Sequence, residues 1–195
     1  VVVGADFHFG KGRRGNVETL GVVGEEFGYE VIGLPLVKHL TGEGEVISST
    51  SIRAALSDGD VEKAHRLLGR PFEVRGVVTP GDRRGRTIGF PTANIPTTTD
   101  LQVPADGVYA AWYIKEDGKQ YPAAVNIGNR PTFYDDADRS LIEAHLIGFR
   151  GDLYGESAKI RFVRRLRGER KFAGIEALKE QLVKDVADAS KCLSD

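Results

Sequence analysis

The chain has 195 residues, 41% of them hydrophobic, which suits one large domain or two small ones with a buried core. Its 27 lysines and arginines nearly balance 28 aspartates and glutamates, which argues against a protein built chiefly to coat nucleic acid. A single cysteine excludes an internal disulfide and a cysteine-based zinc site and fits a reducing cytoplasm. No apolar run approaches the roughly 20 residues of a membrane-spanning helix.

The first 69 residues alternate between strand-like and helical patterns. Val1–Val3 and Tyr29–Val37 are apolar runs typical of parallel strands, and Asn16 and Asp60 are typical helix caps. This order predicts an α/β unit with a parallel sheet, too short to be a complete domain. Because the chain lacks methionine and opens on an apolar run, we expect further N-terminal sequence to precede it.

From residue 70 onward, short strand-like runs are separated by Gly, Pro, Asp or Asn. The runs are Phe72–Val78, Gly107–Ile114, Tyr121–Ile127, Ser140–Leu146 and Ala158–Leu166. Their spacing predicts a small antiparallel barrel, with Asp117-Gly118 as a hairpin turn. Residues 174–193 repeat apolar side chains at three- and four-residue intervals, which predicts an amphipathic helix packed against the barrel.

The stretch GDRRGRTIGFPTAN, residues 81–94, is the most informative part of the chain. Gly81, Gly85 and Gly89 allow the backbone to approach a ligand closely, and Arg86 is one of three arginines suited to phosphate. No Gly-Lys-Ser/Thr follows, so this is not a Walker A loop. A glycine-rich hairpin with solvated arginines is the alternative.

The end of this stretch adds a rigid Phe90-Pro91 followed by two polar side chains. Thr92 and Asn94 would face the same side of a strand and supply neutral oxygens, which suit Mg²⁺. We therefore favour a nucleotide-phosphate and metal site over a plain hairpin.

A second candidate lies in LIEAHLIGFRGDLYG, residues 141–155. Glu143 and His145 would share one face of a strand, with Ile142 and Ala144 in the core. A carboxylate there is costly unless it is paired or exposed to a site, so Glu143 is a candidate general base. The alternative is a solvated glutamate, and we expect His145 to be a structural hydrogen bonder.

Three other segments give weaker signals. Asn126–Phe133 is either a mobile flap or a connecting turn. The basic run Arg161–Lys171 resembles a nucleic-acid patch, but a solvated strand face fits the neutral net charge better. Ser48, Ser49 and Thr50 are ordinary capping residues or, with Arg53, a phosphate grip at a helix N-terminus.

In their order along the chain, these motifs resemble the bifunctional bacterial riboflavin kinase/FMN adenylyltransferase family, also called FAD synthetase. GDRRGRTIGFPTAN, ADGVYAAW, AVNIGNRPTF and IEAHLIGFRGDLYG resemble the kinase module over residues 72–190. ADFHFGKGRRGN and ISSTSIR resemble the second half of the adenylyltransferase module. The resemblance implies half of a Rossmann-like nucleotidyltransferase domain over 1–69 and a small antiparallel β-barrel with a C-terminal helix, the kinase domain, over 70–195.

The resemblance also implies roles for individual residues. It places Mg²⁺ on Thr92 and Asn94, and the catalytic base at Glu143. Flavin falls near Arg170 and Phe172. ATP binding falls on Gly81, Gly85, Arg86, Gly89, Pro91, Thr92 and Asn94. The adenylyltransferase remnant comprises Asp6, Ser48, Ser49, Thr50 and Arg53.

The activity implied is ATP-dependent phosphorylation of riboflavin to FMN in the cytoplasm, with small-molecule substrates and neither nucleic acid nor membrane as a partner. One departure is large, because the family's earlier histidine- and glycine-containing ATP motif does not occur among these residues. Alone, the chain should therefore lack adenylyl transfer, whereas the full-length protein is expected to adenylylate FMN to FAD as well. A non-catalytic flavin- or nucleic-acid-binding barrel is the alternative.

Overall fold

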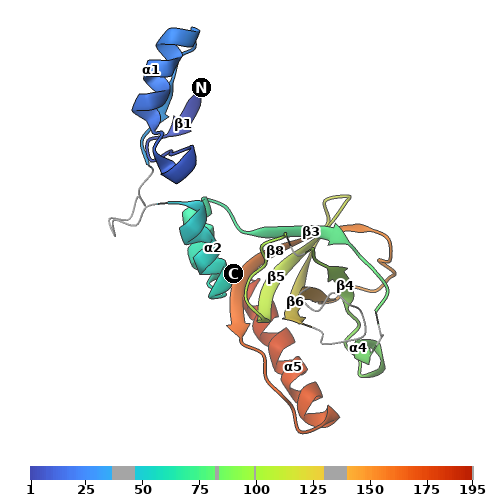
Figure 1. The fold of residues 1–195 in the computed structure, drawn as a ribbon. Helices are drawn as coiled ribbons and strands as arrows, with labels where there is room; N and C mark the ends of the chain where they lie inside the picture. The colour runs from blue at the N-terminus through green and yellow to red at the C-terminus, as the bar shows by residue number, and fades with distance from the viewer. Residues whose placement is uncertain (37–46, 82–83, 99, 130–139, 195) are drawn as a thin grey trace. The chain divides into compact units, whose positions relative to one another are not determined.

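The computed structural model describes residues 1–36, 47–81, 84–98, 100–129 and 140–194. The chain divides into two compact units, Val1–Ser48 and Ser49–Asp195 (Figure 1). The two units meet between Ser48 and Ser49, about 20 residues before the domain boundary predicted between residues 69 and 70. The functional boundary stays a prediction, because it follows from the resemblance.

The described residues of the first unit form a two-stranded parallel sheet, one α-helix and one short 3-10 helix. The elements are β1 (Val2–Gly4), η1 (Lys11–Arg13), α1 (Val17–Phe27) and β2 (Ile32–Leu34). β1 and β2 pair in parallel, as expected from their apolar runs. The Asn16 side chain accepts a hydrogen bond from the Thr19 backbone N–H (2.9 Å), which confirms the predicted helix cap.

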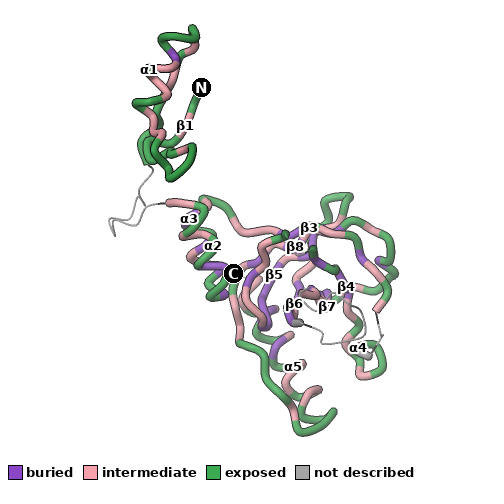
Figure 2. The backbone as a smooth tube through the Cα atoms, in the orientation of Figure 1, coloured by how far each residue is buried: buried purple, intermediate pink, exposed green. Residues whose placement is uncertain are grey.

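The second unit begins with a helical hairpin, α2 (Ser49–Ser57) and α3 (Val61–Leu68). Asp60 caps α3 by accepting from the Lys63 backbone N–H at 2.8 Å, as predicted. Leu56, Val61 and Ala64 are buried and belong to the same hydrophobic core as the barrel strands. Figure 2 shows buried backbone in purple both in this hairpin and in the barrel.

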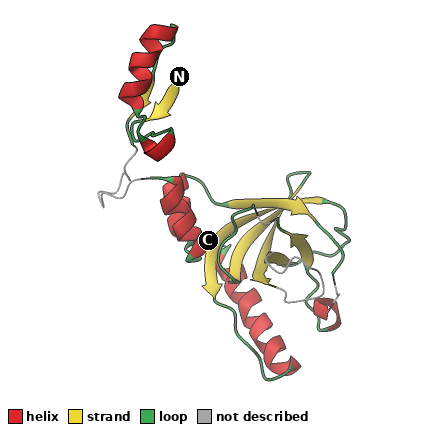
Figure 3. Ribbon diagram, in the orientation of Figure 1, coloured by secondary structure: helices red, strands yellow, loops and turns green. Residues whose placement is uncertain are grey.

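In the described part of this unit, six antiparallel strands follow the hairpin (Figure 3). They are β3 (Glu73–Val77), β4 (Ala93–Pro96), β5 (Gly107–Lys115), β6 (Gln120–Asn129), β7 (Ser140–Leu146) and β8 (Ser157–Arg167). Their order is β3-β8-β5-β6-β7-β4. The Thr79 N–H donates to the Asn94 carbonyl at 2.8 Å, so the sheet nearly closes on itself between β3 and β4. The predicted barrel is confirmed.

Alternate side chains of the strands fill the barrel, including Tyr109, Phe162 and Ile127. The C-terminal helix α5 (Ile175–Cys192) packs on the outer face of the sheet, where Ala189 meets Ala110 and Ala124. Only the C-terminal half of the predicted apolar stripe is covered in this way. Ile175, at the start of the helix, is 58% exposed.

Candidate active site

A row of polar side chains crosses three strands on the outer face of the barrel. Asn94 on β4 lies directly opposite Glu143 on β7, and Glu143 lies opposite Asn126 on β6. Directly paired residues of antiparallel strands share a face, so these three side chains lie side by side. Ile142 and Ala144 are fully buried in the barrel, which confirms the predicted alternation around Glu143. The register therefore joins the two strongest motifs of the sequence.

Asn94 is 6% exposed, and its Oδ1 atom is buried without a hydrogen-bond partner in the part of the chain that the structure describes. A buried amide oxygen of this kind normally has a partner, which makes Asn94 a candidate for contact with a ligand. Thr92 and Asn94 both line one pocket, and their side-chain oxygens, here called the oxygen pair, are neutral ligands of the kind that suits a hard cation. In the described ranges, no three His, Cys, Asp or Glu side chains gather as a metal site.

At two of the predicted glycine positions, the backbone passes so close to neighbouring residues that a side chain would not fit. A Cβ at Gly81 would overlap the Asn94 side-chain amide, and a Cβ at Gly85 would overlap the Phe90 carbonyl. The same added Cβ at Gly85 would lie 3.8 Å from the Thr92 hydroxyl. The glycine-rich segment therefore lies directly against the oxygen pair, where side chains would separate them.

From residue 84 onward, this segment differs from the predicted loop. It contains a short helix, α4 (Arg84–Thr87), which the glycine spacing did not indicate. The Phe90 N–H donates to the Gly85 carbonyl at 2.8 Å, and the Gly89 N–H donates to the Arg86 carbonyl at 3.3 Å. These bonds turn the chain back toward β4.

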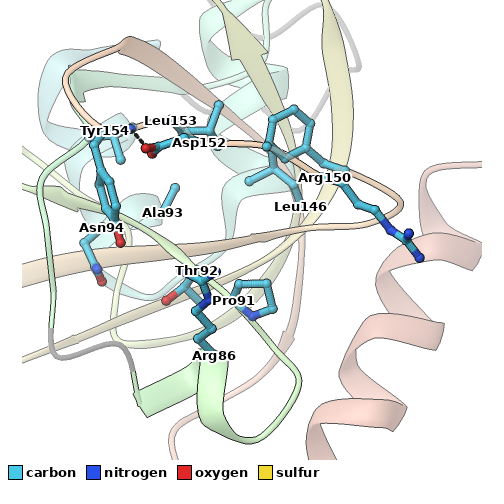
Figure 4. Close-up of a pocket in the computed structure, with 13 residues that line it drawn as sticks. Arg86, Pro91, Thr92, Ala93, Asn94, Leu146, Arg150, Asp152, Leu153 and Tyr154 are labelled. Atoms are coloured by element: carbon cyan, nitrogen blue, oxygen red, sulfur yellow. Dashed lines mark hydrogen bonds between the residues drawn. The ribbon is translucent and has the colours of Figure 1, made fainter.

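A pocket of about 520 Å³ lies beside the oxygen pair. Figure 4 shows side chains from two segments around it. Arg86, Pro91, Thr92 and Asn94 come from the predicted nucleotide-binding stretch, whereas Phe149, Arg150, Asp152 and Tyr154 come from the connection between β7 and β8.

Sequence reasoning missed this second wall of the pocket. Within residues 141–155, only Glu143 and His145 were singled out as candidates. The signal was present in Gly148, Gly151 and Gly155, three glycines that mark a tight loop after a strand. Within this loop the Asp152 carboxylate accepts from the Tyr154 N–H at 3.0 Å.

His145 links the strand of Glu143 to the start of β4. Its Nδ1 lies 2.8 Å from the Pro91 carbonyl, and because a carbonyl can only accept, Nδ1 carries the proton. Its ring also meets Phe90 edge-on at 5.4 Å between centroids. The predicted structural role of His145 is confirmed.

The predicted flavin-binding residues lie in the linker between β8 and α5. Arg170 Nη1 donates to Gln181 Oε1 at 3.0 Å, and the Phe172 ring lies 5.8 Å from the Arg167 guanidinium. A Cβ at Gly128 on β6 would overlap the Glu169 carboxylate, so the linker passes close to β6. Gly128 is two residues from Asn126, which places the linker beside the polar row.

The basic run Arg161–Lys171 is paired within the protein. Arg161 bonds Glu73 at 2.8 Å, and Arg164 bonds Glu62 at 3.1 Å. Arg165 donates to the carbonyls of Asp58 (3.0 Å) and Asp106 (2.7 Å). The arginines of this face are thus paired within the protein, and the face is partly solvated as expected, since the side chain of Arg164 is 56% exposed.

The remaining predictions concern the adenylyltransferase remnant and the flap. Asp6 follows β1 in the first unit, with its carbonyl 2.7 Å from His8 Nδ1. Ser49, Thr50 and Arg53 lie in α2, and Ser48 directly precedes it. In the predicted flap Asn126–Phe133, residues 126–129 instead continue β6, because they pair with β7, and residues 130–133 lie outside the described residues.

Comparison with known proteins agrees with the barrel fold. The family model for riboflavin kinase, or flavokinase, matches residues 68–193. The chain therefore belongs to the riboflavin kinase family. The model for FAD synthetase matches residues 1–51, so both halves of the predicted resemblance are confirmed.

The curated relatives are named bifunctional riboflavin kinase/FMN adenylyltransferase. The Bacillus subtilis protein is 42% identical over 195 residues, which are all of this chain and 60% of the relative. The Escherichia coli K12 protein is 39% identical over 95% of this chain and 57% of the relative. The chain thus spans about three-fifths of the length of these relatives.

Solved structures are also similar to this chain, and two of them are described here. A Streptococcus pneumoniae chain named as a macrolide-efflux protein has a TM-score of 0.78 and 36% identity, covering 96% of this chain and 58% of that one. A riboflavin kinase from Trypanosoma brucei has a TM-score of 0.50 and 27% identity, covering 64% of this chain and 81% of that one. In the described part of the chain, no helix is long and apolar enough to cross a membrane.

Proposed function

We propose that this chain transfers the γ-phosphoryl group of ATP to the ribityl 5′-hydroxyl of riboflavin, forming FMN. The observation that carries the proposal is the register of β4, β7 and β6. It places the Glu143 carboxylate directly beside Asn94, whose buried oxygen has no partner in the described residues. Phosphoryl transfer depends on positioning, and this register would hold a proton acceptor next to a residue that binds the phosphoryl donor.

The donor side is the pocket lined by Arg86, Thr92 and Asn94. Arg86 supplies positive charge for phosphate, and the close glycines leave room for it. Thr92 and Asn94 fit Mg²⁺ as two neutral oxygen ligands, with phosphate oxygens and water completing the shell. When bound, the metal would neutralise charge on the transferring phosphate.

In this scheme Glu143 accepts the proton of the riboflavin hydroxyl. The hydroxyl oxygen forms a bond to the γ-phosphorus while the bond from phosphorus to the bridging oxygen breaks, and ADP leaves with that electron pair. Strand β7 is paired on both sides, so the carboxylate is held by a rigid element.

The acceptor side lies by the linker and the first turns of α5. Arg170 and Phe172 offer a cation and an aromatic ring, and the start of the helical stripe is uncovered, with Ile175 58% exposed. An apolar aromatic ring with polar edges, such as isoalloxazine, suits such a surface.

Replacing Glu143 with glutamine tests the proposal. We expect kcat to fall by about 10²- to 10⁴-fold, because the general base is lost. Riboflavin binding, followed by flavin fluorescence, should change little. Glu116→Gln, an exposed glutamate at the β5–β6 turn, is the matched control. Near-normal FMN formation by Glu143→Gln would refute the assigned role.

FMN adenylylation to FAD is the second candidate function, for the whole protein. The match of residues 1–51 to FAD synthetase favours it. A cytoplasmic location and the absence of nucleic-acid and membrane partners belong to the same proposal and stay predictions. A non-catalytic barrel, by contrast, would consume no ATP when riboflavin is present.

A further inference from the structure

The linker between β8 and α5, residues 168–174, is organised by one carboxylate that no step of the proposed chemistry uses. Asp185 lies on α5 and is 2% exposed. Its carboxylate accepts hydrogen bonds from Arg167, at the end of β8, and from Gln181, one turn earlier on α5. These two partners in turn contact the linker.

The ion pair with Arg167 is bidentate. Arg167 Nε lies 2.9 Å from Asp185 Oδ1, and Arg167 Nη2 lies 2.7 Å from Oδ2. The side chains are 14% and 3% exposed, so water screens the pair little. Parallel N–H···O bonds of this kind fix the plane of the guanidinium.

The fixed guanidinium then contacts the linker at two points. Its Nη1 donates to the Gly168 carbonyl at 3.0 Å, and its Cζ lies 5.8 Å from the centre of the Phe172 ring. A cation at that distance is attracted by the face of the ring. Arg167 thereby restrains the start of the linker and the aromatic side chain within it.

The second branch runs through Gln181. Its Nε2 donates to Asp185 Oδ1 at 2.8 Å, which turns its Oε1 toward Arg170 Nη1 at 3.0 Å. The carboxylate therefore sets the orientation of the amide, and the amide holds Arg170. A buried ion pair adds little to the free energy of unfolding compared with apolar side chains of similar size. We therefore assign this pair the role of fixing the positions of the side chains around it.

We propose that Asp185 is a positioning residue for the acceptor side of the site. Through Arg167 and Gln181 it holds Phe172 and Arg170 in the arrangement that receives riboflavin. This inference rests on the proposed function. The linker also lies beside β6 at Gly128, next to the row that contains Glu143.

The test compares Asp185→Asn with Asp188→Asn, which removes the same charge from an exposed position of the same helix. For Asp185→Asn we expect the KM and the Kd for riboflavin to rise about 10-fold, with kcat and the KM for ATP within about twofold of the original. Asp188→Asn should leave all four values unchanged.

Gln181→Leu is the second variant, because it releases Arg170 while the Arg167–Asp185 pair stays intact. We expect it to raise the riboflavin KM and Kd about threefold. If Asp185→Asn does not fold, the riboflavin KM and Kd of Gln181→Leu test the positioning role instead.

Unchanged riboflavin KM and Kd in the folded variants would overturn the inference, as would an equal loss in kcat and in both KM values. If the original chain does not phosphorylate riboflavin, the proposed function fails separately. The fluorescence titration of riboflavin without ATP then still decides whether Asp185 organises the binding surface.

Discussion

Asn94 connects the closure of the barrel to the proposed donor site. Its carbonyl accepts from the Thr79 N–H and joins the two edge strands, while its side chain lies under Gly81. Its Oδ1 is buried without a partner among the described residues. A ligand at this oxygen would therefore be held by a residue that the barrel itself keeps in place.

Gly81→Ala tests the contact between the glycine-rich segment and Asn94. The added methyl group would overlap the Asn94 amide, so the segment or the amide must move. We expect the KM for Mg²⁺·ATP to rise about 10-fold with riboflavin binding unchanged, measured by steady-state kinetics and flavin fluorescence. Gly21→Ala in α1, where a Cβ meets open space, is the control. An unaltered KM would show that the close contact between Gly81 and Asn94 has no role in ATP binding.

The hairpin of α2 and α3 packs against the barrel, although its sequence motif belongs to the predicted adenylyltransferase half. It carries most of the predicted phosphate motif of the adenylyltransferase, yet its apolar side chains are buried in the barrel core. The Ala105 N–H donates to the Leu56 carbonyl at 2.9 Å, and Arg165 bonds the Asp58 carbonyl. The hairpin is thus a structural part of the barrel unit.

Leu56→Ala should therefore destabilise the barrel. Leu56 is 1% exposed, and removing such a side chain costs about 2–5 kcal/mol of unfolding free energy. Urea unfolding followed by the fluorescence of Trp112, the single tryptophan, on β5, measures this. Leu101→Ala, at a site 38% exposed, should change the unfolding free energy by less than about 1 kcal/mol. An equal effect of the two substitutions would contradict the buried role of the hairpin.

In the whole molecule, the two compact units match two different families. Residues 1–51 match FAD synthetase and residues 68–193 match riboflavin kinase. The barrel unit contains both the oxygen pair and Glu143, so the proposed kinase site is assembled within one unit.

We therefore predict that the 195-residue chain forms FMN but no FAD. The reason is that the histidine- and glycine-containing ATP motif does not occur in its sequence. Chromatography of riboflavin, FMN and FAD after incubation with Mg²⁺·ATP checks this, with FMN supplied directly in a parallel reaction. FAD in either reaction would show that adenylyl transfer does not depend on that motif.

The sequence by itself determined the local structure and the family of this protein. The caps at Asn16 and Asp60, the alternation around Glu143 and the helical stripe of α5 depend on neighbours a few residues away, so periodicity reveals them. The order of the motifs revealed the resemblance to the riboflavin kinase family, and that resemblance supplied the substrates of the proposed reaction.

Only the tertiary structure placed Glu143 beside Asn94, 49 residues earlier in the chain, because strand register depends on long-range pairing and on which face is buried. The same holds for the second wall of the pocket, the hairpin in the barrel core and the half-covered α5. Each is decided by which surfaces meet after the chain has folded, and residue spacing along the chain carries no such information.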